Sequence, residues 1–142
     1  MWKTVSLTHA EGMELLRPVQ IDPGFLKFHD YALKHHVPLT VVSCGLDFII
    51  QEYLAWHLGG EFKITILVNY GKAIGDKWLV TYRDDSPYTH DKSVCIQQAR
   101  QAFLDKSDKI SGQEHIAVFC GDGISDWGAA READILFARR GL

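Results

Sequence analysis

Two aspartates four residues apart, Asp122 and Asp126, follow a short apolar stretch in this chain and enclose a glycine, an isoleucine and a serine. The preceding residues, Val118–Cys120, favour a strand, and those from Trp127 onward favour a helix. Carboxylates on a loop at the carboxyl end of a strand lie where ligands bind in open α/β sheets, and their oxygens suit a hard cation such as Mg²⁺. The spacing predicts a metal and phosphate corner; the alternative is a plain Asp-Gly turn.

Two other positions carry groups that suit an anion. Ser43 follows the apolar run Pro38–Val42 and precedes Gly45, so its hydroxyl and the N–H groups of the turn can meet a phosphate at the next helix. The alternative for Ser43 is a simple helix cap. Lys92 lies at an expected helix start, where a cation is unfavourable against the helix dipole unless it serves a nearby anion. The alternative for Lys92 is a solvated surface lysine.

Helical and strand patterns alternate along the chain, which predicts a doubly wound α/β sheet. Asp22-Pro23 signals a helix start and Gly59-Gly60 a helix end. The expected helices are Pro23–His36, Leu46–Trp56 and one from Asp91 with Val94, Cys95, Ala99 and Phe103 on its inner face; Ala10–Leu16 is expected as an isolated helix. The expected strands are the buried Pro38–Val42, Ile64–Val68 with a hairpin around Gly75 running to Tyr82, the buried Ile116–Cys120, and Ile135–Ala138.

Composition restricts the class of protein. With 142 residues, 46% of them hydrophobic, the chain has the size of one globular domain. A net charge of −3 without long charged runs argues against a nucleic-acid binder. No apolar run approaches the roughly 20 residues that span a bilayer. The first residues lack a secretory pattern, and three cysteines fit reduced thiols, so we expect a cytoplasmic protein without membrane partners.

The order of Ser43 after a strand, Lys92 at a helix start and Gly121-Asp-Gly-Ile-Ser-Asp126 after a strand resembles three motifs of the haloacid dehalogenase superfamily of phosphatases. The stretch Cys120–Gly141 resembles the phosphoserine-phosphatase-like branch. Tyr82–Ser93 and Asp22–Phe25 are similar to fungal members of that branch. The resemblance covers nearly the whole chain from about residue 10.

That resemblance implies a Rossmann-like, three-layer α/β core with a mostly parallel sheet over residues 21–142, preceded by a remnant of a helical cap or an extension over residues 1–20. It implies Mg²⁺-dependent hydrolysis of a small-molecule phosphate ester. Ser43, with Cys44 and Gly45, would bind the phosphoryl oxygens. Lys92 would neutralise their charge, Asp122 and Asp126 would hold Mg²⁺, and Asp126 would also act with Lys92 in catalysis.

The chain departs from the family pattern because no Asp-x-Asp followed by Gly and Thr or Val occurs in it. In the family this motif supplies the nucleophile from a strand between the strand that ends at Ser43 and the strand that ends at Cys120. Loss of a nucleophile costs on the order of 10⁶ in rate. Unpaired edges on the two flanking strands would also favour self-association.

We therefore expect a phosphatase that is incomplete or inactive as this chain. The alternative is a non-catalytic remnant, or a fragment completed by another chain, that binds phosphate or Mg²⁺. The cap that would select the substrate is mostly missing, so the sequence leaves the substrate open. Three other motifs are disfavoured: a dinucleotide loop at Gly121, whose third glycine is Asp126; a cysteine phosphate loop at Cys95 and Arg100, which lie in a helical pattern; and a zinc site, because no histidine pairs at helical spacing with a second ligand.

Overall fold

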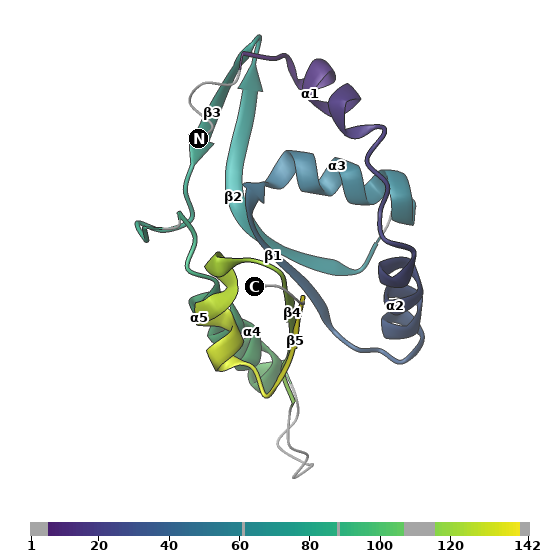
Figure 1. The fold of residues 1–142 in the computed structure, drawn as a ribbon, viewed down its shortest axis with the longest axis vertical. Helices are drawn as coiled ribbons and strands as arrows, with labels where there is room; N and C mark the ends of the chain where they lie inside the picture. Colours follow the sequence, from purple (N-terminus) through teal and green to yellow (C-terminus); the bar gives the residue numbers. More distant parts are fainter. Residues whose placement is uncertain (1–5, 61, 88, 107–115, 140–142) are drawn as a thin grey trace. The chain divides into compact units, whose positions relative to one another are not determined.

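The computed structural model describes residues 6–60, 62–87, 89–106 and 116–139. The chain forms two compact units, Met1–Asp85 and Ser86–Leu142, and each is described by itself. Unit 1 contains α1 (His9–Leu16), α2 (Pro23–Lys34), β1 (Leu39–Leu46), α3 (Asp47–Leu58), β2 (Ile64–Ile74) and β3 (Lys77–Thr81). Unit 2 contains α4 (Lys92–Lys106), β4 (Val118–Gly121), the short 3₁₀ helix η2 (Ile124–Asp126), α5 (Trp127–Glu132) and β5 (Ile135–Ala138) (Figure 1).

The sheet of unit 1 has the order β1-β2-β3. The first half of β2 pairs with β1 in parallel, and its second half, from Tyr70 on, pairs with β3 as an antiparallel hairpin. Helix α3 connects β1 to β2 and lies against both strands (Figure 1). The mixed α/β class, the parallel pairing and the hairpin around Gly75 are confirmed.

Capping residues mark the starts of both amino-terminal helices of unit 1, and the start of α2 at Asp22-Pro23 is as predicted. The Asp22 carboxylate accepts a hydrogen bond from the Gly24 N–H (2.6 Å), and Pro23 occupies the first turn. Helix α1 begins after a capping box formed by Thr8 and Glu11. The expectation of an isolated α1 is wrong, because Gly12 lies directly against the indole of Trp78 on β3.

Strand β1 differs from its prediction in length and burial. It runs to Leu46 and so includes Ser43–Gly45, which we expected in a turn after the strand. Its pairing with β2 shifts register between Val42 and Leu46, so an irregular strand end takes the place of the turn. Residues 39–45 are only partly buried, because β1 pairs with β2 alone within the described ranges.

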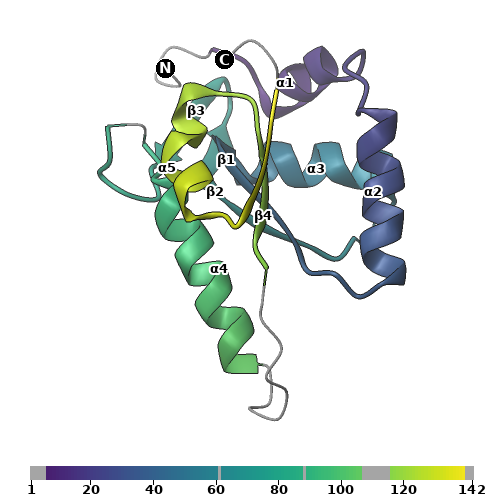
Figure 2. The ribbon, with the colours of Figure 1, turned by 60° about the horizontal axis from the view of Figure 1, so that its bottom comes forward.

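Unit 2 contains a two-stranded parallel sheet in which β4 pairs with β5. Helices α4 and α5 pack on each other and lie on the same side of this pair (Figure 2). The strand expected at 116–120 is present as β4, but its expected burial is wrong, since Val118 is 54% exposed. All four residues of β5 are exposed as well. Parallel sheets are normally covered on both faces, and within the described residues of unit 2 the helices cover one face of this pair.

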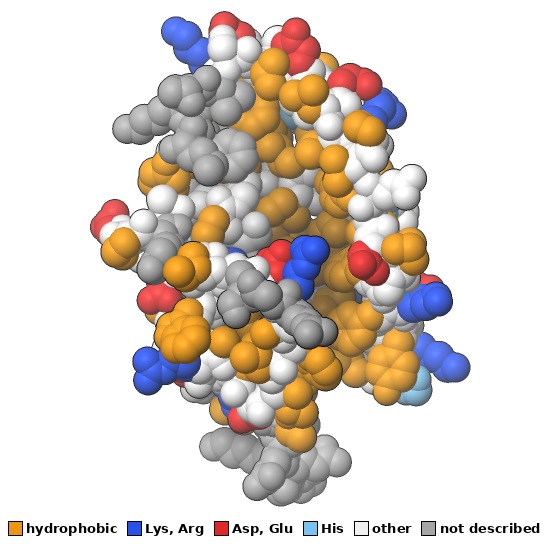
Figure 3. Space-filling model, viewed as in Figure 1, with side chains coloured by type: hydrophobic (Ala, Val, Ile, Leu, Met, Phe, Trp, Pro, Cys, Tyr) orange, Lys and Arg blue, Asp and Glu red, His pale blue; other side chains and the backbone are white. Residues whose placement is uncertain are grey.

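The inner face of α4 is only partly as predicted. Cys95 and Ile96 are its buried residues, whereas Val94 and Phe103 are exposed. Hydrophobic side chains reach the surface widely over both units (Figure 3). The three cysteines are free thiols, as expected. Among the described residues, no helix has the length and apolarity needed to cross a membrane.

Candidate functional site

An ion pair between Lys92 and Asp126 lies at the centre of the candidate site in unit 2. Lys92 Nζ donates to Asp126 Oδ1 at 2.5 Å, and each side chain is only 11% exposed. Lys92 comes from the first residue of α4 and Asp126 from the end of η2, 34 positions later. The structure therefore brings together two of the residues that the sequence pattern singled out.

The amino-terminal end of α4 is fixed by short contacts that position Lys92. Asp91 Oδ1 accepts hydrogen bonds from both the backbone N–H (2.9 Å) and the hydroxyl (2.6 Å) of Ser93. His90 and Cys95 are almost fully buried and lie 2.8 Å apart, from Nε2 to Sγ. A lysine carried by such a constrained backbone keeps its ammonium group in place, which a phosphate-binding cation requires.

Asp126 also organises the loop that precedes it. Its Oδ2 accepts hydrogen bonds from the backbone N–H groups of Asp122 (2.9 Å) and Gly123 (3.0 Å). Burial opposes ionisation of this carboxyl, but the hydrogen bond from Lys92 and those from the two amides outweigh it, so the pKa of Asp126 lies below its usual range. Asp126 is therefore an anion at neutral pH that ties the loop to Lys92.

The loop needs glycine at position 121 for space. A Cβ built on Gly121 would lie 2.7 Å from Asp126 Oδ2 and 2.8 Å from the Phe119 ring. At Gly123 the nearest atoms are 3.7 Å away, which is ordinary contact. The strand can therefore approach the aspartate closely only because residue 121 has no side chain.

The two carboxylates differ in their availability to a metal. Both oxygens of Asp126 already accept hydrogen bonds, so its geometry suits a holding role. Asp122 is exposed, and no described residue hydrogen bonds to its side chain. Mg²⁺ is commonly bound through one or two carboxylates together with water and phosphate oxygens, and Asp122 fits one such place. No cluster of three or more metal-ligating side chains occurs among the described residues.

Ser43, Cys44 and Gly45 lie in unit 1, at the irregular carboxyl end of β1. Ser43 Oγ accepts a hydrogen bond from the Gly45 N–H at 3.0 Å. Gly45 packs closely, since a Cβ there would lie 2.9 Å from Ile50 Cδ1. These residues thus form a tight turn-like segment directly before α3, and we name it the Ser43–Gly45 segment.

Sequence reasoning missed Asn69, which holds the Ser43–Gly45 segment. Asn69 is fully buried in β2; its Nδ2 donates to the Cys44 carbonyl (3.0 Å), and its Oδ1 accepts from the Arg83 N–H (2.9 Å). The signal was present in the sequence, because a single asparagine ends the apolar run that begins at Ile64. A polar side chain in a buried strand needs partners, and here both partners are backbone groups.

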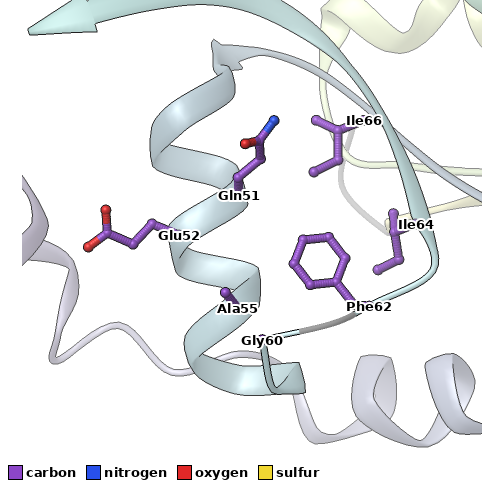
Figure 4. A pocket seen from close by; sticks show the side chains of 7 residues that line it. All are labelled: Gln51, Glu52, Ala55, Gly60, Phe62, Ile64 and Ile66. Atoms are coloured by element: carbon purple, nitrogen blue, oxygen red, sulfur yellow. The ribbon is translucent and has the colours of Figure 1, made fainter.

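A cavity of about 520 Å³ in unit 1 lies between α3 and β2 (Figure 4). Its walls combine polar and apolar side chains and come from Gln51, Glu52, Ala55, Gly60, Phe62, Ile64 and Ile66. None of the predicted site residues lines it. It offers a phosphate no cation, so it is not part of the candidate site.

Comparison with known proteins identifies the family of the chain. The family model for haloacid dehalogenase-like hydrolases matches residues 5–131. The chain belongs to this family. The match includes both the Ser43–Gly45 segment and the Lys92–Asp126 pair.

Three curated relatives show which members of the family the chain resembles in sequence. A polyol phosphate phosphatase of Saccharomyces cerevisiae, PYP1, is 36% identical over 99% of this chain and 60% of its own length. The Pdp3-interacting factor 1 of Schizosaccharomyces pombe is 34% identical over the same shares. A 2-hydroxy-3-keto-5-methylthiopentenyl-1-phosphate phosphatase of Lysinibacillus sphaericus is 28% identical over 88% of this chain and 53% of its own. The chain thus spans little more than half the length of these relatives.

Proposed function

We propose that this chain carries the phosphate-binding and metal-binding part of a Mg²⁺-dependent phosphatase that acts on small-molecule phosphate esters. The single observation that carries the proposal is the Lys92–Asp126 pair, whose carboxylate also holds the loop of Asp122. Membership of a hydrolase family that includes phosphatases supports it. We also propose a cytoplasmic location, which the three free thiols support.

The proposed roles follow from charge. A phosphoryl group in transfer spreads negative charge over its oxygens, so cations and N–H or O–H donors stabilise it. The Lys92 ammonium would neutralise part of this charge, and the Ser43 hydroxyl would donate to a phosphoryl oxygen. Asp126 would keep Lys92 protonated and in place. Asp122 would hold Mg²⁺, which supplies further positive charge when bound.

None of these residues is assigned the role of nucleophile. The sequence contains no Asp-x-Asp-Gly motif. We propose that the 142-residue chain binds phosphate and Mg²⁺ but does not turn over a phosphate ester alone, and that an additional strand carrying an aspartate restores turnover. Strands β1 and β4 support this proposal, because within the described residues each pairs with only one other strand.

The test is hydrolysis of p-nitrophenyl phosphate and of a polyol phosphate such as glycerol 3-phosphate by the purified chain with Mg²⁺. Asp122→Ala is the matched variant. We expect no turnover from the chain, and turnover from a longer polypeptide that adds an Asp-x-Asp-Gly strand before residue 1. Turnover by the 142-residue chain that disappears in Asp122→Ala would mean that another residue serves as nucleophile. Absence of turnover from the longer polypeptide would contradict the proposed activity.

A second candidate is a binding protein without catalysis. The missing nucleophile motif is the observation that favours it. Phosphate binding to both the short and the long polypeptide, with turnover by neither, would support this second function over the first.

A further inference from the structure

The Cys44–Gly45 peptide group is held at both ends by side chains. Because a peptide unit is planar, the Cys44 carbonyl and the Gly45 N–H belong to one rigid group. Asn69 Nδ2 donates to the carbonyl at 3.0 Å, and the Gly45 N–H donates to Ser43 Oγ at 3.0 Å. The direction of the Ser43 hydroxyl is therefore linked to Asn69 through one peptide plane.

The burial and the hydrogen bonds of Asn69 fix the orientation of its side chain against this peptide plane. Asn69 is 0% exposed, so a donor or acceptor of its side chain left unpaired would cost the full desolvation penalty. Its Oδ1 accepts from the Arg83 N–H at 2.9 Å, which fixes which end of the amide faces Cys44. Strand β2 places Asn69 opposite Leu46, immediately after the register shift of β1.

We propose that Asn69 is a positioning residue for anion binding, which orients the Ser43 hydroxyl through the Cys44–Gly45 peptide. Asn69 itself touches no ligand in this assignment. The inference rests on the proposed function, since it needs the Ser43–Gly45 segment to bind a phosphoryl group. In chemical terms, the neutral side-chain amide of Asn69 uses one donor and one acceptor to fix the groups that would donate hydrogen bonds to phosphate.

The informative variant is Asn69→Asp, which keeps the shape and the acceptor for Arg83 N–H but places a carboxylate oxygen against the Cys44 carbonyl. We expect inorganic phosphate to bind this variant about tenfold more weakly than wild type, because the peptide plane loses its fixed orientation. The control is Leu54→Ala, which removes a buried core side chain of α3 and destabilises the same unit without touching the segment. This control should bind phosphate as wild type does.

The chain offers a direct probe, because Asn69 is the one asparagine in the sequence. Selective ¹⁵N-asparagine labelling gives one side-chain amide pair in NMR spectra. Titration with inorganic phosphate should shift this pair in the wild-type protein and leave it unmoved in Ser43→Ala. In the Ser43→Ala background, Asn69→Asp should cause no further loss of affinity, since its effect passes through Ser43.

The outcomes separate the two proposals. A wild-type chain that is folded but does not bind phosphate overturns the proposed function, and this inference with it. Phosphate binding that is equal in wild type and Asn69→Asp overturns the inference alone. Equal losses of phosphate affinity in Asn69→Asp and Leu54→Ala would mean that Asn69 contributes only to general stability, which also overturns the inference. A further full loss of affinity from Asn69→Asp in the Ser43→Ala background would have the same meaning.

Discussion

At the scale of single residues, Asp126 connects Lys92 of α4 to the loop of Asp122 and Gly123. It accepts from the Lys92 ammonium and from two backbone N–H groups, whereas Lys92 is tied to the loop through Asp126. Truncation of Asp126 leaves the Lys92 ammonium and two backbone N–H groups without their acceptor. Truncation of Lys92 leaves Asp126 with its two backbone hydrogen bonds.

We therefore expect Asp126→Ala to lower the free energy of unfolding of unit 2 by about 3 kcal/mol, and Lys92→Met by clearly less. Urea titration followed by Trp127 fluorescence, in a background where the other three tryptophans are replaced by phenylalanine, measures both changes. Equal effects, or a larger effect of Lys92→Met, would contradict the view that Asp126 organises the loop.

Glycine at position 121 is a second residue-scale requirement. Gly121→Ala forces its methyl group to within 2.7 Å of Asp126 Oδ2. We expect a loss of about 1–3 kcal/mol in stability, as for overpacked sites in general. Gly123→Ala is the matched control, since its Cβ would find the nearest atoms at 3.7 Å and its φ of −132° suits any residue. Thermal unfolding of the two variants should separate them; similar midpoints would show that the strand shifts to make room.

Asp134 links elements of unit 2 and carries a pH-dependent part of its stability. Its Oδ2 accepts from the Ala117 N–H (2.7 Å) before β4 and from Arg100 (2.6 Å) of α4. The backbone hydrogen bond from Ala117 is the main cause that lowers the pKa of Asp134; desolvation opposes it, and Arg100 adds to the lowering.

A carboxyl whose pKa is lower in the folded state stabilises the fold above its unfolded pKa of about 3.9, and this contribution is lost as the pH falls through the folded pKa. We expect the urea midpoint of the wild-type chain to fall more between pH 6 and pH 3 than that of Asp134→Asn. Parallel pH profiles for the two proteins would refute the role assigned to this carboxylate.

The order of elements was readable from the sequence, because capping residues and apolar periodicity are local signals. Asp22-Pro23 and the strand Ile135–Ala138 are at their predicted places. The burial of individual side chains was harder to predict from the sequence. Val118 and Val94 are exposed although their patterns favoured the core, because burial depends on which other elements cover a strand or helix. For the same reason Asn69 was missed: its partners Cys44 and Arg83 are 25 and 14 residues away in the sequence.

At the scale of the whole molecule, the division into two compact units has a thermodynamic consequence. Trp56 and Trp78 lie in unit 1, and Trp127 is the tryptophan of unit 2. We expect variants that keep only one of these three tryptophans, with Trp2 also replaced, to report different urea midpoints. The reason is that the all-or-none behaviour of a single domain is not expected from two separate cores. Coincident transitions from all probes would show that the chain unfolds as one unit.

Exposed strands in the described part of the chain also bear on self-association, which we propose for the isolated chain. The four residues of β5 are exposed, and β1 has a partner strand on one side among the described residues. Such surfaces favour pairing between copies. Sedimentation velocity over a range of concentrations should show a rising mean mass, and a longer polypeptide that adds the proposed aspartate-bearing strand should show less of this rise. A constant monomer mass would exclude this behaviour.

Strand β2 serves two partners in succession: its first residues belong to the parallel pairing with β1, and Tyr70–Ile74 belong to the hairpin with β3. The pairing of β2 with β1 ends at Asn69, so the hairpin turn at Gly75 depends on a part of β2 that does not pair with β1. This separation makes the tip a natural point for grafting foreign sequence. A short epitope or a lanthanide-binding peptide inserted between Gly75 and Asp76 would give the chain an experimental handle while leaving the Ser43–Gly45 segment as it is.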